Sequence, residues 1–221
     1  MVKNEEKSMK TTLIFIRHGF SVSNKKKIYT GSTDIDLTET GRIQAEKCAE
    51  LMAKMKPDAV YSSDLKRAYE TALPTANALG LEVKVEPGIR EIFGCDWEGC
   101  TFAELVERYP VEYGTWQNDI GRAVCPGGES VVGFSMRVEA AVRRIAEDNE
   151  GKTVCIASHA MPIRAMCTLA KGLPYEQMQE IPFVRNASVN VFEYENGTLT
   201  ALSLDGVSHL GEYMTESHDS V

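Results

Sequence analysis

Short apolar runs alternate along the chain with stretches in which apolar positions recur at helical spacing. The runs are rich in β-branched residues and end at turn residues, which is typical of buried strands. Alternation of strands and helices favours an α/β fold. Strands are expected at residues 13–16, 59–62, 83–85 and 153–157, helices at 38–55, 63–79, 101–109, 129–147 and from about 162, and a hairpin at 188–194 and 198–204.

One region interrupts this alternation. Residues 110–128 show no clear periodicity, and irregular segments of this length are usually functional. We expect the insertion at about 100–128 to form a lid or substrate wall, with a mobile insertion as the alternative. The chain is otherwise expected to form a single domain over 11–210, between a flexible lead-in at 1–10 and a flexible tail at 211–221.

The first strand ends in Arg17, His18 and Gly19. Open α/β sheets keep their sites at the carboxyl ends of strands. An arginine fork suits a tetrahedral oxyanion, a neutral imidazole can attack phosphorus, and glycine lets the backbone approach a ligand. The tripeptide alone fits an ordinary polar turn equally well, so its interpretation depends on the rest of the chain.

Two further positions supply the same chemistry. Arg67 falls in the first turn of a helix, where the helix dipole opposes a cation unless an anion binds at the same end. The strand at 153–157 is followed closely by His159, as the first strand is by His18. Taken alone, Arg67 would be a surface residue and His159 a structural one. Together with Arg17, they predict a phosphate pocket.

A proton donor is expected in the acidic, glycine-rich stretch at 89–99. Burial beside its apolar residues would raise the pKa of a carboxyl group there toward a useful value. Glu91, Asp96 and Glu98 are all candidates, and their spacing does not choose among them.

The formal net charge of −8 argues against a nucleic-acid or acidic-membrane binder, and no apolar run is long enough to span a membrane. The first ten residues lack the apolar core of a secretory signal. The six cysteines form no zinc-type cluster, which indicates reduced thiols in a cytoplasmic setting. The lysines at 25–27 are either a solvated patch or a feature that steers an anionic substrate.

With these features assembled, the chain resembles the histidine phosphatase superfamily, which includes cofactor-dependent phosphoglycerate mutases and many phosphomonoesterases. The resemblance covers about residues 11–210. The motifs that carry it are Arg17-His18-Gly19, Asn24, Gly31, Asp34-Ile35-Asp36-Leu37-Thr38, Gly41, Ser62-Ser63-Asp64-Leu65-Lys66-Arg67-Ala68, Thr71-Ala72, Glu91, Gly94, Trp97-Glu98-Gly99, Pro126-Gly127-Gly128-Glu129-Ser130 and Ser158-His159.

The resemblance implies a three-layer α/β/α sandwich around a mostly parallel sheet, and catalysis without a metal or cofactor. It implies that His18 becomes phosphohistidine, that Glu91 donates a proton to the leaving oxygen, and that Arg17, Arg67 and His159 hold the phosphate. Substrate-binding residues are then expected to be Asn24, Ser21, Thr30, Gly31 and Ala160.

The sequence departs from the family pattern at three positions that follow these motifs. Phe20 and Ser21 stand where the family often has Glu or Gln followed by Thr, so that a bulky apolar group is expected near the pocket. Ala160 replaces a common glycine. These changes bear on substrate identity more than on activity.

The leading hypothesis is therefore a phosphomonoesterase that hydrolyses small phosphorylated metabolites. The alternatives are a phosphoglycerate mutase, for which the insertion has only Arg108 and Arg122 to hold a substrate carboxylate, and an inactive phospho-ligand binding module. Aromatic residues would form either a wall for the leaving group or core packing; they are Phe20, Trp97, Tyr113 and Trp116. The sequence leaves the physiological ester and the oligomeric state open, with a homodimer as one option.

Overall fold

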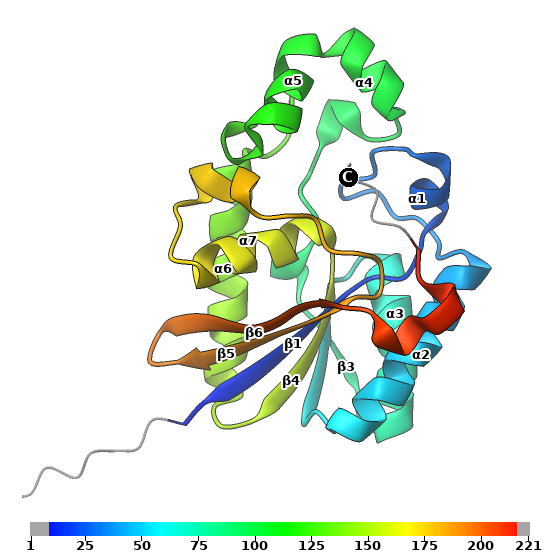
Figure 1. Cartoon of the computed structure of the whole chain (residues 1–221), viewed down its shortest axis with the longest axis vertical. Coiled ribbons are helices and arrows are strands. Elements are labelled where there is room, and N and C mark those ends of the chain that lie inside the picture. Colours follow the sequence, from blue (N-terminus) through cyan, green and yellow to red (C-terminus); the bar gives the residue numbers. More distant parts are fainter. Residues whose placement is uncertain (1–8, 216–221) are drawn as a thin grey trace, which may run out of the picture.

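The computed structural model describes residues 9–215, and a six-stranded sheet forms its centre (Figure 1). The strands lie in the order β3-β2-β4-β1-β5-β6. β1 to β4 are parallel, and β5 and β6 add an antiparallel hairpin at one edge. The strands are β1 (Thr11–Arg17), β2 (Ala59–Ser62), β3 (Val83–Val85), β4 (Thr153–Ser158), β5 (Val189–Glu195) and β6 (Thr198–Gly206). The predicted mostly parallel sheet is thus confirmed.

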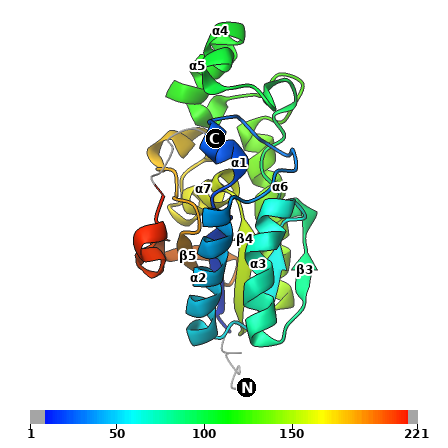
Figure 2. The same ribbon diagram turned by 90° about the vertical axis from the view of Figure 1, so that its right-hand side faces the viewer.

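Helices cover both faces of the sheet (Figures 1 and 2). Side chains of β1 alternate between two cores, because successive residues of a strand point to opposite faces. Ile14 and Ile16 pack with residues of α2 and α3, whereas Leu13 and Phe15 pack with residues of α6 and α7. The predicted three-layer sandwich is confirmed. The helices are α1 (Val22–Lys26), α2 (Glu39–Met55), α3 (Lys66–Leu79), α4 (Phe102–Arg108), α5 (Pro110–Asn118), α6 (Val131–Asp148) and α7 (Ala160–Ala170).

β1 and β4 are hydrogen-bonded neighbours that end together. Arg17, the last residue of β1, is in register with Ser158, the last residue of β4. The backbone N–H of His18 continues the ladder by donating to the Ser158 carbonyl over 2.9 Å. The residues that follow both strands are therefore brought to the same edge of the sheet.

The insertion is more regular than the sequence indicated. The helix expected at 101–109 is present as α4, but the part expected to be irregular begins with a second helix, α5, and α4 and α5 lie beyond the end of the sheet (Figure 1). Pro110 opens α5, and Tyr113 and Trp116, one turn apart, are buried. Both rings make edge-on contacts with Trp97, which is fully buried. These three aromatic residues are core packing.

The chain after β6 departs from the predicted flexible tail. A 3-10 segment at Ser208–Tyr213 packs against α2, where Leu210 is buried and the Gln44 side chain donates to the Tyr213 carbonyl over 2.8 Å. The first residues of the expected tail, 211–215, therefore belong to the folded chain. Residues 1–8 of the expected lead-in and 216–221 of the expected tail, which include His218, lie outside the described residues.

Within residues 9–215, no helix is both long enough and apolar enough to cross a membrane. All six cysteines are free, and five of them are buried, in agreement with the prediction of reduced core thiols. Burial raises the pKa of Cys155 to about 12, so this thiol stays protonated.

Candidate active site

A cavity opens at the carboxyl edge of β1 and is lined by most of the predicted site. Eight of the ten predicted residues line it: Arg17, His18, Ser21, Asn24, Thr30, Gly31, Arg67 and Glu91. The other two, His159 and Ala160, lie next to this set, because the His159 ring centroid is 5.2 Å from that of His18.

His18 is held in one orientation. It is 4% exposed, and its Nδ1 lies 2.8 Å from the carbonyl oxygen of Gly19. A carbonyl can only accept, so Nδ1 carries the proton and Nε2 keeps its lone pair. Burial and the nearby Arg67 and Arg17 cations lower the pKa of His18 well below its ordinary value. The ring is therefore a neutral imidazole with a free nucleophilic nitrogen.

Two buried arginines flank this imidazole. Arg17 donates through Nη1 to the Val184 carbonyl, and its buried Nε has no partner among residues 9–215. Arg67 donates to the carbonyls of Thr33 and Gly31. Burial lowers the pKa of each guanidinium to about 10, so both remain cationic at neutral pH. Neither forms an ion pair with a described carboxylate, which leaves their charge available to an anion.

Glu91 is the only one of the three candidate carboxylates that lines the cavity. It is 2% exposed and accepts hydrogen bonds from the backbone N–H of Ile92 and, more weakly at 3.4 Å, of Met161 in the first turn of α7. Burial raises its pKa above the ordinary value, and these hydrogen bonds and the two arginines only partly oppose the shift. This is the environment expected of a general acid.

The other two candidates do not reach the cavity. Glu98 accepts hydrogen bonds from the backbone of Ser32 and Gly94 and contacts the Thr33 hydroxyl, so it holds the loop that follows Gly31. Asp96 has its carboxylate beside the Cys95 thiol.

His159 is fully buried beside His18. Its Nε2 lies 2.9 Å from the Ser63 hydroxyl, and its Nδ1 has no partner among the described residues. Burial, Arg67 and the neighbouring His18 lower its pKa well below the ordinary value. Ser63 was missed as a site residue, although it lies in the motif that precedes α3.

The loop after Gly19 supplies polar groups to one wall. The Asn24 side-chain oxygen accepts from the backbone and hydroxyl of Ser21 and from the Asn186 amide, which leaves its NH₂ group to face other partners. The Ser21 hydroxyl thus orients Asn24. Gly31 has a left-handed φ of 51°, and a Cβ there would meet the Glu98 carboxylate, so only glycine fits. Ala160 begins α7.

Phe20 does not line the cavity, contrary to the expectation that its ring would enter. Its backbone instead anchors the loop, because Thr38 donates to its carbonyl and its N–H donates to Gln44. The aromatic residue that does line the cavity is Phe102, the first residue of α4. Sequence patterning gave no sign of this, because Phe102 follows an ordinary helix cap.

Comparison with known proteins agrees with this geometry. The family model described as histidine phosphatase superfamily (branch 1) matches residues 13–205. The chain belongs to this superfamily. It is 34% identical over 209 residues to phosphoserine phosphatase 1 of Hydrogenobacter thermophilus, covering 95% of this chain and 99% of the relative. It is 32% identical over 184 residues to glucosyl-3-phosphoglycerate phosphatase of Mycobacterium tuberculosis, covering 80% and 82%.

Solved structures show the same fold. Bacillus stearothermophilus YhfR superimposes with a TM-score of 0.86 at 28% identity, covering 90% of this chain and 99% of that structure. With relatives named as phosphatases and a matching family model, this chain is a phosphoric monoester hydrolase of the histidine phosphatase superfamily.

Proposed function

We propose that the chain hydrolyses small phosphate monoesters through a phosphohistidine on Nε2 of His18. One observation carries the proposal: a neutral imidazole, fixed by its Nδ1–Gly19 hydrogen bond, shares the cavity with two buried arginines that pair with no carboxylate of residues 9–215. Such an arrangement attacks an electrophile that brings its own negative charge.

The phosphoryl oxygens are expected to meet four groups. Arg17 and Arg67 supply positive charge, and the Asn24 amide supplies a neutral donor. The fourth group is the Nδ1–H of His159. The ring proton stands on Nδ1 when the Ser63 hydroxyl donates to Nε2, and this Nδ1 has no partner in the described part of the chain. The two orphaned polar atoms, Arg17 Nε and His159 Nδ1, support this assignment because buried donors are normally satisfied.

The chemistry then has two steps. The His18 Nε2 lone pair forms an N–P bond while the P–O ester bond breaks, and the Glu91 proton passes to the leaving oxygen. In the second step, water attacks phosphorus, its proton passes to the Glu91 carboxylate, and the N–P bond breaks. His18 and Glu91 return to their starting states, and phosphate leaves.

We further propose that preferred substrates carry a second anionic group near the phosphate. Lys27 lines the cavity, is exposed, and has no ion-pair partner within residues 9–215. The relatives named as phosphoserine and glucosyl-3-phosphoglycerate phosphatases act on esters that contain a carboxylate. A cytoplasmic location is consistent with six free cysteines.

The mutase alternative has less support. Of the two insertion arginines, Arg108 contacts the Cys100 sulfur and stacks on Tyr109, and Arg122 pairs with Asp119. Neither lines the cavity, so neither is placed to hold a substrate carboxylate or a priming diphosphate. Phosphate release unaffected by added 2,3-bisphosphoglycerate is expected; obligatory dependence on it would favour the mutase.

Trapping of the covalent intermediate tests the proposal directly. Brief incubation with ³²P-labelled phosphoserine followed by acid-free denaturation should leave acid-labile label on the wild-type chain. His18→Ala should carry no label and release no phosphate. His209→Ala is the matched control, since His209 is a half-buried histidine near Cys48 and away from the cavity. Normal phosphate release by His18→Ala would overturn the proposal.

A further inference from the structure

Glu91 lies in a short segment that belongs to no helix or strand. Residues 90–94 follow a single 3-10 turn at Pro87–Ile89 and precede another at Cys95–Trp97. Backbone groups that are buried without regular structure must find partners elsewhere. The position of the Glu91 carboxyl therefore depends on whatever those partners are.

Side chains supply them. In the 3-10 turn and the segment that follows it, the four successive carbonyls of residues 88–91 accept hydrogen bonds from distant side chains. Arg137 donates to the carbonyls of Gly88 and Arg90. Ser158 donates to that of Ile89, and Ser32 donates to that of Glu91. Arg137 alone thus holds the carbonyl immediately before Glu91 and another two residues earlier.

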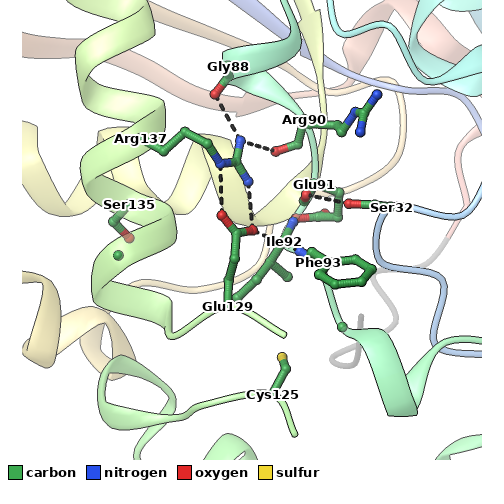
Figure 3. Close-up of polar contacts among 12 residues, drawn as sticks. Ser32, Gly88, Arg90, Glu91, Ile92, Phe93, Cys125, Glu129, Ser135 and Arg137 are labelled. Carbon is green, nitrogen blue, oxygen red and sulfur yellow. Dashed lines mark hydrogen bonds and ion pairs between the residues drawn. The ribbon is translucent and has the colours of Figure 1, made fainter. Parts of the chain in front are cut away.

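Glu129 holds the other side of Glu91. Its carboxylate accepts the Phe93 N–H over 2.9 Å, and its own N–H donates to the Phe93 carbonyl over 3.0 Å. It also forms a two-bond ion pair with Arg137, through Nε at 2.9 Å and Nη2 at 2.8 Å (Figure 3). The Glu129–Arg137 pair therefore holds the backbone of residues 88–93 from the side of α6 (Figure 3), and neither residue lines the cavity.

Local sequence places both members. Ser130 caps α6 by accepting from the Gly133 N–H, which puts Glu129 just before the helix and Arg137 two turns along it. The preceding turn needs glycine at 128, because a Cβ there would meet the Phe93 carbonyl oxygen at 2.2 Å. Glu129 belongs to the Pro-Gly-Gly-Glu-Ser motif, to which the catalytic scheme above gives no role.

We infer that Glu129 and Arg137 are positioning residues that aim the Glu91 carboxyl at the leaving oxygen. The inference rests on the proposed function, in which Glu91 is the proton donor. The pair acts through the backbone and touches no substrate. Its loss should therefore impair proton donation and leave phosphate binding and nucleophilic attack in place.

Leaving-group dependence separates these effects. Alkyl esters such as phosphoserine need a proton on the departing oxygen, whereas p-nitrophenyl phosphate releases a stable phenolate without one. The ratio of kcat/KM for the two esters reports proton donation, because kcat/KM covers steps only up to leaving-group departure. Arg137→Lys and Glu129→Gln should lower kcat/KM for phosphoserine roughly tenfold, a fraction of the 10²–10⁴ that a positioned acid contributes, and for p-nitrophenyl phosphate less than about threefold.

Arg143→Lys is the matched control. Arg143 lies on the same helix and pairs with Glu139, but its carbonyl partner is Gly197 in the β5–β6 turn. It should change neither ester's kcat/KM. Ser32→Ala offers a second, smaller probe, because it removes only the contact to the Glu91 carbonyl.

Glu91→Gln distinguishes the possible failures. If it slows phosphoserine selectively and the Arg137 and Glu129 variants slow both esters equally, the positioning role is wrong and the proposed proton donor stands. If Glu91→Gln itself shows no selectivity, the proton-donor assignment in the proposed function fails, and the positioning role fails with it. Selective loss in all three variants, with an unchanged Arg143→Lys, supports the inference.

Discussion

His18 and His159 follow two hydrogen-bonded strands, whereas Glu91 lies in a segment with no regular structure. The positions of His18 and His159 follow from the sheet, because the register of β1 with β4 fixes both strand ends at once. Glu91 has no such frame, and its segment takes its geometry from side chains of α6, of the last residue of β4 and of the loop after Gly31. The register of two strands thus places the two histidines, whereas side-chain hydrogen bonds to the backbone place Glu91, the proton donor of the proposed mechanism.

This difference predicts two kinds of loss. Arg67→Ala removes a cation of the cavity that, in the proposed mechanism, faces the phosphoryl group whatever alcohol is attached. We expect kcat/KM to fall by roughly 10³-fold, the size of effect found when one oxyanion-stabilising donor is removed. The fall should be the same for phosphoserine and p-nitrophenyl phosphate. Steady-state kinetics on both esters measures this fall. An unequal fall would contradict the separation of phosphate binding from proton donation.

Arg42→Ala is the control for that variant. Arg42 is an exposed arginine on α2 that pairs with Glu70, and it does not line the cavity. Its kinetics should match the wild type.

The pH dependence of kcat/KM should also distinguish proton donation from phosphate binding. Burial raises the pKa of Glu91, with Arg67, Arg17 and the N–H groups of Ile92 and Met161 as the opposing groups that face it. The acid must be protonated in the first step, so kcat/KM for phosphoserine should fall as pH rises through this pKa, approaching tenfold per pH unit. For p-nitrophenyl phosphate this limb should be absent. Glu91→Gln should remove it for phosphoserine; its persistence in that variant would assign the limb to another group.

The same contrast explains what could be predicted from sequence. The strand ends were recognisable because an apolar run followed by histidine is a local signal, and it occurs twice. Glu91 could not be chosen over Asp96 and Glu98 by spacing, because the residues that hold the backbone just before it are distant in the sequence. Arg137, 46 residues later, holds the Arg90 carbonyl, and Ser158 holds that of Ile89. Only the family resemblance selected it.

Two other parts of the fold escaped prediction for a similar reason. The helix α5 has its buried aromatic residues in contact with Trp97 rather than along a regular apolar stripe, so periodicity did not reveal it. The segment after β6 is held by the buried Leu210 and by contacts of Gln44 and Cys48 of α2, which no local pattern could indicate.

Loss of a residue that only selects the substrate should lower kcat/KM less than loss of Arg67. Lys27→Gln removes an exposed cation of the cavity that is proposed neither to bind the phosphate nor to donate the proton. We expect kcat/KM for phosphoserine to fall about fivefold, as for loss of an exposed charge pair worth up to about 1 kcal/mol, while phosphoethanolamine, which lacks the carboxylate, is unaffected. Lys25→Gln is the control, because Lys25 does not line the cavity. Equal losses on both esters would exclude a role in reading the carboxylate.

Ser130→Ala should give the smallest catalytic effect. It tests whether the position of Glu91 depends on the Glu129–Arg137 ion pair itself or only on the stability of α6. The Ser130 hydroxyl caps the start of α6, so its removal should lower the free energy of unfolding by about 1 kcal/mol. The Glu129–Arg137 bonds and the contacts to residues 88–93 do not involve its hydroxyl. Denaturant unfolding should therefore register the change, while the phosphoserine to p-nitrophenyl phosphate ratio stays at the wild-type value. A ratio that moved with stability would mean that any weakening of α6 misplaces Glu91, and the ion pair would then have no particular part in aiming it.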